Sequence, residues 1–201
     1  MTLTTDNPRS RVAIFIDLRN VFKSVEMMKT AGLHLDLFAL AKQLNRGREL
    51  IAAYVFDSRR PFGMEDESRR LHDRLRYLGF RVMAREAYDP ERDQQKEVDV
   101  AMACEMVVHG LRGNYDVAIV VSGDRDFVPA IQHVQAAGKQ VEVAAFSSAL
   151  SNEMKRTADR FHELDKMPLM IMNNPSDMLA PELTGDDEMS DDAGEGVSID
   201  G

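Results

Sequence analysis

Short, nearly continuous apolar runs alternate with helix-length segments along most of this chain, and this alternation restricts the fold more than any other feature. Five runs are rich in β-branched or aromatic residues: Val12–Ile16, Leu50–Phe56, Phe80–Ala84, Val117–Val121 and Val141–Phe146. Strands that are covered on both faces have this pattern, whereas strands with one solvated face alternate apolar and polar residues. The sequence therefore predicts an α/β protein, a three-layer α/β/α sandwich around a mostly parallel sheet of five or six strands.

The segments between these runs have the apolar spacing of helices, as a sandwich with covered faces requires. They are Val21–Ala31, Leu35–Asn45, Glu65–Leu78, Val98–Leu111, Phe127–Ala137 and Ala149–Asp159. In 201 residues, 44% of them hydrophobic, such a body has enough apolar mass for one core. We expect a single folded domain.

The net charge of −9 is unevenly distributed along the chain. All 25 Lys and Arg residues lie at or before Lys166, whereas nine of the 34 Asp and Glu residues follow it, so the chain up to Lys166 is electrically balanced. The end of the chain is acidic and poor in large apolar groups, a composition that does not offset the entropy of ordering. We predict a flexible segment at 1–10, a folded domain at 11–166 and a disordered acidic tail at 167–201.

The single cysteine, Cys104, excludes a disulfide scaffold and a cysteine-rich zinc site, and the five histidines lack paired metal-ligand spacing. There is no apolar run long enough to span a membrane, and residues 1–11 do not resemble a signal peptide. These features predict a cytoplasmic protein that does not act at a membrane. The sequence leaves open whether the chain forms a homo-oligomer or binds a protein partner through its tail.

Acidic residues follow two of the predicted strands. Asp17 comes directly after the first strand, and Asp124 and Asp126 follow the fourth. Open parallel sheets bind ligands beyond the carboxyl ends of their strands, where the strand order reverses. If the first and fourth strands are neighbours at that point, these carboxylates meet, and Asp99, at the start of the helical segment before the fourth strand, is a candidate to join them.

Several carboxylates at one edge repel each other, so they either become protonated or hold a cation. A set of oxygen ligands without His or Cys favours Mg²⁺ or Mn²⁺, which bind readily to phosphate groups. Such a metal site activates water and stabilises the charge that develops on a phosphodiester. The pattern therefore indicates hydrolysis of a phosphate ester.

Three motifs together resemble the NYN domain, and more narrowly the LabA/DUF88 branch of the PIN-like nuclease superfamily. They are the strand ending at Asp17 with Asn20 after it, the segment 96–101 around Asp99, and the segment 122–127 with Gly138–Val141 after it. The resemblance extends over about residues 11–165. It implies a Mg²⁺- or Mn²⁺-dependent endoribonuclease with an acidic cluster at Asp17, Asp99, Asp124 and Asp126.

The resemblance also matches two polar positions, Asn20 beside the first Asp and Ser122 before the second acidic pair, as substrate-binding candidates. Lys96 is a further candidate for contact with a phosphate, as is Arg19, which stands where relatives often have a small residue. Each acidic residue has a structural alternative, because Asp at a strand-to-helix junction is a common helix N-cap. This alternative applies most to Asp126; at Asp17 it competes with Asn20, which offers another cap.

A basic region follows the second strand. It contains eight arginines: Arg59, Arg60, Arg69, Arg70, Arg74, Arg76, Arg81 and Arg85. Arginine binds phosphates in a bidentate manner and stacks on bases, so Arg70 and Arg74 are candidates to bind RNA, single-stranded or structured. The alternative is a solvated helix whose arginines pair with neighbouring acids.

Two classes of function remain open. The favoured one is a metal-dependent ribonuclease acting on RNA. The other is a regulator that keeps the fold and binds RNA or protein without catalysis. A Toprim-like enzyme or a covalent aspartyl phosphotransferase fits less well, because the first requires Glu where Asp17 stands and the second requires Asp where Arg19 stands.

Overall fold

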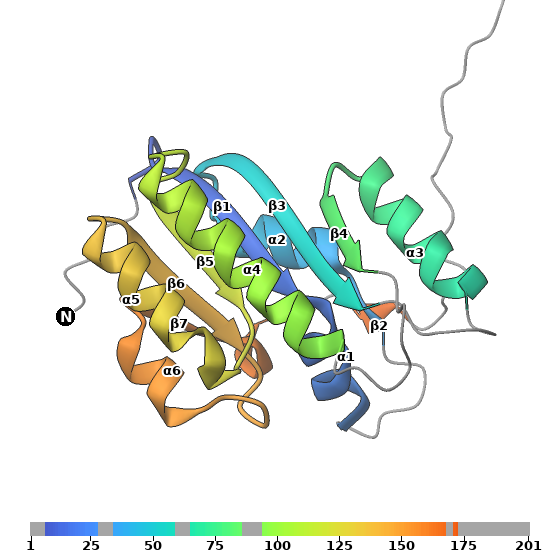
Figure 1. Ribbon diagram of the computed structural model, residues 1–201. Helices are drawn as coiled ribbons and strands as arrows, with labels where there is room; N and C mark the ends of the chain where they lie inside the picture. The colour runs from blue at the N-terminus through green and yellow to red at the C-terminus, as the bar shows by residue number, and fades with distance from the viewer. Residues whose placement is uncertain (1–6, 28–33, 59–64, 86–93, 168–170, 173–201) are drawn as a thin grey trace, which may run out of the picture.

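The computed structural model describes residues 7–27, 34–58, 65–85, 94–167 and 171–172. Its centre is a sheet of six parallel strands in the spatial order β4-β3-β1-β5-β6-β7 (Figure 1). The strands are β1 (Arg11–Asp17), β3 (Glu49–Ser58), β4 (Arg81–Arg85), β5 (Val117–Val121), β6 (Gln140–Ala145) and β7 (Arg160–Glu163). The predicted α/β fold with a parallel sheet of five or six strands is confirmed.

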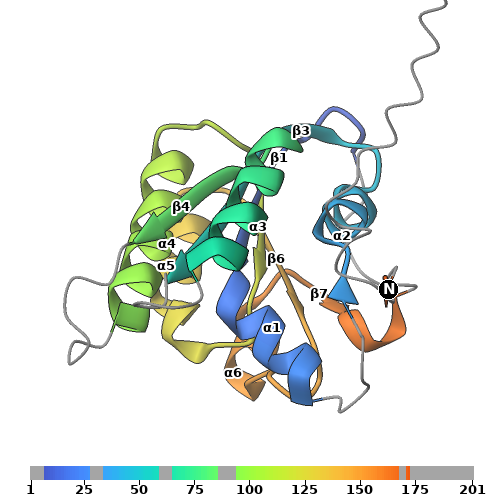
Figure 2. The same cartoon turned by 90° about the vertical axis from the view of Figure 1, so that its right-hand side faces the viewer.

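Helices cover both faces of the sheet, which completes the three layers (Figures 1 and 2). One face packs against α1 (Leu18–Met27), α2 (Leu37–Asn45) and α3 (Glu65–Tyr77). The other face packs against α4 (Gln94–Leu111), α5 (Val128–Ala136) and α6 (Asn152–Thr157). The remaining described elements are short: the 3-10 turns η1 (Arg125–Phe127) and η2 (Leu164–Lys166), and an antiparallel pair formed by β2 (His34–Leu35) and β8 (Ile171–Met172).

Strand β1 lies in the middle of the sheet and shows why the apolar runs are continuous. Ile14 and Ile16 point into the core beneath α1 and α2, while Phe15 points into the opposite core beneath α4. All three side chains are completely buried. Because both faces of a central parallel strand are covered, every residue of β1 after Arg11 is buried.

The strand order reverses between β1 and β5. The chain passes from β1 outward through β3 to β4, then returns to β5 and continues through β6 to β7. Ile16 lies beside Val121, so the residues that follow these two strands leave the sheet side by side. The predicted adjacency of the first and fourth strands is confirmed, and it places the expected site at the switch point.

The bounds of several elements differ from the sequence predictions. Helix α6 ends at Thr157, and the chain then forms edge strand β7. The residues of β7 are mostly polar, so this strand has no apolar run. Helices α1 and α4 begin a few residues before the predicted positions, at Leu18 and Gln94. The residues added to α4 are polar, so hydrophobic periodicity gives no signal for them, whereas α1 gains the buried Leu18.

The ends of the chain are described only in part. Residues 1–6 and 173–201 lie outside the described ranges, so the predicted flexible start and disordered tail stay predictions. Strand β8 belongs to the segment that we predicted as tail, yet it pairs with β2. No helix in the described part of the chain has the length and apolar character needed to cross a membrane.

Candidate functional site

Asp17 ends β1, and only 3% of it is exposed, at the carboxyl edge of the sheet. Its Oδ1 accepts a hydrogen bond from the backbone N–H of Asn20 at 3.1 Å, which is the contact of a helix N-cap. Its Oδ2 accepts a hydrogen bond from the hydroxyl of Ser122 at 3.2 Å. The capping function that the sequence left between Asp17 and Asn20 thus belongs to Asp17, and α1 begins at the next residue for this reason.

Ser122 links the two strand ends. Its hydroxyl donates to Asp17 and also accepts a hydrogen bond from the backbone N–H of Asp124 at 3.2 Å. The side chain of Asn20 spans the same gap, because its Oδ1 accepts a hydrogen bond from the backbone N–H of Gly123 at 3.2 Å. The structure therefore brings together four predicted site residues, Asp17, Asn20, Ser122 and Asp124.

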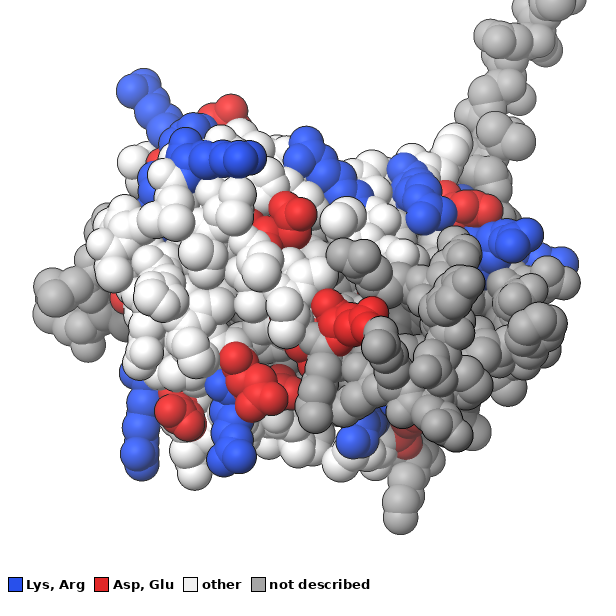
Figure 3. Space-filling model, in the orientation of Figure 1, with Lys and Arg blue, Asp and Glu red and all other residues white. Residues whose placement is uncertain are grey.

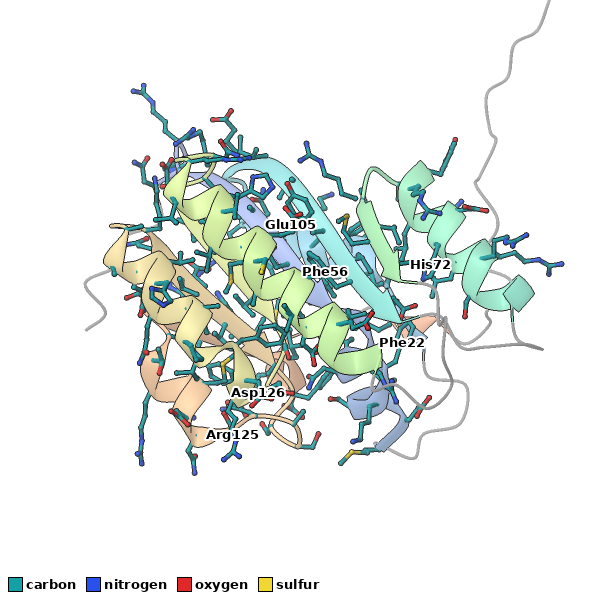
Figure 4. All side chains as sticks on the ribbon, in the orientation of Figure 1. Phe22, Phe56, His72, Glu105, Arg125 and Asp126 are labelled. Atoms are coloured by element: carbon teal, nitrogen blue, oxygen red, sulfur yellow. The ribbon has the colours of Figure 1, made fainter. Side chains whose placement is uncertain are left out.

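Asp124 is half-buried and begins the turn η1. Its Oδ1 accepts a hydrogen bond from the backbone N–H of Asp126 at 3.0 Å. Asp126 therefore receives no capping function here, and it is exposed beyond the carboxyl end of β5 (Figure 4). Asp124 caps η1, and the N-cap position of α5 is Phe127, which makes no side-chain cap, so Asp126 does not have the capping role that the sequence allowed.

The other predicted site residues lie around this centre. Asp99 is half-buried on α4, a helix that packs against both β1 and η1. Arg19 is exposed in the first turn of α1. The side chain of Lys96 lies outside the described residues. Within the described ranges, no three His, Cys, Asp or Glu side chains lie close enough to hold one ion, so the four predicted acids are not gathered into a single cluster.

The residues at the switch point fit a magnesium or manganese ion in their chemistry. All their side-chain donors are oxygen atoms, from Asp17, Asp124, Ser122 and Asn20. Mg²⁺ in enzymes is commonly held by one or two carboxylates and completes its shell with water and substrate phosphate. Two carboxylates at adjacent strand ends therefore suffice, and a third protein ligand is not required.

The described arginines of the basic region differ in exposure and in the contacts of their side chains. Arg69 and Arg70 are exposed on the first half of α3, which follows the carboxyl end of β3. Arg74 is half-buried and lies over the ring of Tyr77. Arg76 pairs with an acidic neighbour, and Arg81 donates to the hydroxyl of Tyr54 at 2.7 Å. Arg59 and Arg60 lie outside the described residues, as does the side chain of Arg85.

Sequence reasoning missed one polar pair at the same edge of the sheet. His72 on α3 is completely buried, and its Nε2 lies 2.8 Å from Oδ2 of Asp57, near the end of β3 (Figure 4). The Nδ1 atom of this histidine is buried and has no hydrogen-bond partner among the described residues. One feature of the sequence could have indicated Asp57 as a polar residue at this edge: it follows an apolar run, just as Asp17 does.

A six-stranded parallel sheet with carboxylates at its switch point defines an α/β protein of PIN-like architecture. Comparison with known protein families matches residues 11–165 to the NYN domain, and the chain belongs to this family. The family membership that the motifs predicted is therefore confirmed.

The chain is similar to a curated protein in sequence and to a solved structure in fold. The chain is 28% identical over 172 residues to the low amplitude and bright protein LabA of Synechococcus elongatus, covering 81% of this chain and 88% of LabA. A crystal structure of a protein of unknown function from Vibrio parahaemolyticus superimposes with a TM-score of 0.66 at 23% identity. That match covers 81% of this chain and 98% of the Vibrio chain, and it supports the fold alone.

Proposed function

We propose that this protein is a ribonuclease that hydrolyses RNA phosphodiester bonds with Mg²⁺ or Mn²⁺ held by Asp17 and Asp124. The observation that carries the proposal is the Ser122 hydroxyl, which is hydrogen-bonded to both of these residues at the switch point of the sheet. Membership of the NYN family supports it, because this family belongs to a nuclease superfamily that generally uses divalent metals.

In this proposal the chain's own residues fix the carboxylates. Asp17 is buried and held by two hydrogen bonds, so its orientation is set before substrate arrives. Asp124 is held by the turn that it caps, and it is the more accessible of the two. The metal would supply a Lewis acid and an activated water. Asp99 and Asp126 would act at the rim, directly or through water.

We place the RNA strand along the carboxyl edge toward α3. The exposed Arg19, Arg69 and Arg70 are the described arginines best placed to meet phosphates there, whereas Arg74 and Arg81 are engaged with tyrosines. Arginine contacts of this kind give affinity that falls with salt and depends little on sequence.

A regulator that binds RNA or protein without cleavage is the second candidate. The observation that favours it is the dispersal of the acids, since no three potential ligands converge among the described residues. A non-catalytic protein does not need to hold a metal ion, so dispersed acidic residues are compatible with this function.

Cleavage of end-labelled single-stranded RNA with Mn²⁺, Mg²⁺ or EDTA distinguishes the two candidates. We expect metal-dependent cleavage by the unmodified protein and a rate lower by about a hundredfold or more for Asp124→Asn, because the metal contributes several kcal/mol. The Asn side chain still offers an oxygen to the N–H of Asp126, so the turn is kept and the charge alone is lost. Mn²⁺ should also raise the melting temperature of the unmodified protein and not that of the variant.

Asp36→Asn is the matched control. Asp36 caps α2 through the backbone N–H groups of Phe38 and Ala39, and α2 covers the opposite face of the sheet from α4. This variant should cleave at the original rate. RNA binding without cleavage in either metal, or equal cleavage by Asp124→Asn, would reject the ribonuclease and leave the regulator.

A further inference from the structure

Helix α4 is apolar on its outer side as well as on its inner side. Between Val98 and Leu111 its most exposed residues are Val100 (61%), Val108 (39%), Leu111 (67%) and the thiol-bearing Cys104. These four residues form one stripe along the helix, because they are spaced by three or four positions. A helix of a monomeric protein normally presents charged residues to water along such a stripe.

The neighbouring helix α5 extends this surface. It packs beside α4, and no residue from Val128 to Ala136 is Asp, Glu, Lys or Arg. Its exposed residues are Pro129, Gln132, His133 and Ala136. In a chain with 29% charged residues, the face formed by α4 and α5 therefore carries few charges: Glu105 stands on α4 beside His109, and most other Lys, Arg, Asp and Glu residues in this view lie around the face (Figure 3).

We propose that this face is the interface of a twofold-symmetric homodimer in which α4 packs antiparallel to α4 of a second copy. An antiparallel pair centred near Glu105 and Met106 places Val100 opposite Leu111 of the partner subunit, and Cys104 opposite Val108 of the partner subunit. The stripe is thus complementary to itself, which is what a twofold axis requires.

The charges at the two ends of the stripe also support an antiparallel pair with a second copy of the chain. Glu97 and Arg112 are both exposed and are the charged residues that bound the stripe along the helix. They lie on the same flank of α4, so in the antiparallel pair Glu97 meets Arg112 of the partner subunit at each end.

The arrangement has a consequence for the candidate site. Asp99 lies in the N-terminal part of α4, about two residues from Glu97, so Arg112 of the partner subunit would stand close to the acidic edge of the sheet. The 18 residues of α4 span about 27 Å, and the two candidate sites would lie near opposite ends of the helix pair.

Molar mass measured by sedimentation over a range of concentrations tests the proposal. We expect a reversible dimer, and we expect Val100→Glu with Leu111→Glu to weaken it by about a hundredfold or more, because like charges would meet in an apolar interface. Both positions are exposed, so the fold should persist. Tyr77→Glu on α3 is the control, since Tyr77 is 72% exposed and lies outside the stripe; it should leave the dimer unchanged.

The antiparallel register has its own test. Val100→Glu with Leu111→Lys should form a dimer at least about tenfold tighter than the double Glu variant, because each Glu then faces a Lys. A short bis-maleimide should also join two chains through Cys104, the only cysteine, and fail to do so in Cys104→Ser. A monomer at all concentrations, or equal dimerisation of both double variants, would overturn the proposal, whatever the outcome of the cleavage assay.

Discussion

Replacing Glu142 by Gln is expected to lower the free energy of unfolding by about 3–5 kcal/mol, although the residue lies far from the candidate site in the chain. Glu142 is 3% exposed on β6, and its carboxylate accepts two hydrogen bonds from Arg48, at 2.8 and 3.1 Å. Arg48 is itself 6% exposed. Removing the carboxylate charge would leave a guanidinium buried without its counter-ion, which is the costly outcome for a buried ion pair.

Two further basic side chains contact the same carboxylate from edge strand β7. His162 Nε2 lies 2.8 Å from Oε2 of Glu142, and Arg160 lies 3.6 Å from Oε1. Glu142 thus joins β6, β7 and the turn between α2 and β3 through one buried group. Glu163→Gln is the matched control, because Glu163 is on β7 and pairs at the surface with Lys166. Urea titration should show a large loss of stability for Glu142→Gln and little for Glu163→Gln; equal midpoints for Glu142→Gln and the unmodified protein would contradict this account.

The same cluster predicts a dependence of stability on pH. Burial by itself would raise the pKa of Glu142, but hydrogen bonds from His162 and Arg48 outweigh it and lower the pKa from 4.5 to about 2. A lowered pKa means that the ionised group stabilises the fold above its ordinary pKa, and that this contribution is lost as the pH falls. The difference in unfolding free energy between the unmodified protein and Glu142→Gln should therefore be full at neutral pH and shrink between pH 4.5 and about 2. A difference that stayed constant over this range would contradict it.

Prediction from sequence succeeded where a signal is local. The apolar runs predicted the central strands, because burial on both faces excludes polar residues from them. The rule for ligand sites in parallel sheets then correctly predicted that Asp17 and Asp124 lie at one edge. Edge strand β7 was missed because Arg160 and His162 are polar, and they are polar because they face Glu142.

Contacts between distant segments gave no such signal. Asp57 and His72 belong to different elements, and nothing in their spacing indicates that they meet. The capping of η1 by Asp124 and not by Asp126 depends on where the turn begins, which varies by one or two residues in any sequence prediction. The need for glycine at position 123 is a further case, because it depends on Ala149 in the loop after β6.

Gly123→Ala is expected to destabilise the protein by about 3 kcal/mol and to distort the candidate site. A Cβ at this position would lie 2.6 Å from the carbonyl carbon of Ala149 and closer still to its oxygen. Overpacking of this kind typically costs about 1–3 kcal/mol, and each hydrogen bond lost adds about 1 kcal/mol. Two are at risk, because the Gly123 carbonyl accepts from Ser151 N–H and its own N–H donates to Asn20.

The atoms that a Cβ at position 123 would meet belong to the backbone of Ala149 and Leu150, so changing a side chain there cannot remove the clash. Ala149→Gly in the Gly123→Ala background should not restore stability, because the carbonyl group that meets the new Cβ remains. Gly138→Ala is the control for a general effect of glycine replacement: its Cβ would meet nothing within 4 Å, and only its φ of +76° opposes alanine, at about 1 kcal/mol. Equal melting temperatures for Gly123→Ala and Gly138→Ala, or rescue by Ala149→Gly, would show that the loop after β6 yields. Asp17, Asn20 and Ser122 would then not depend on that loop for their positions.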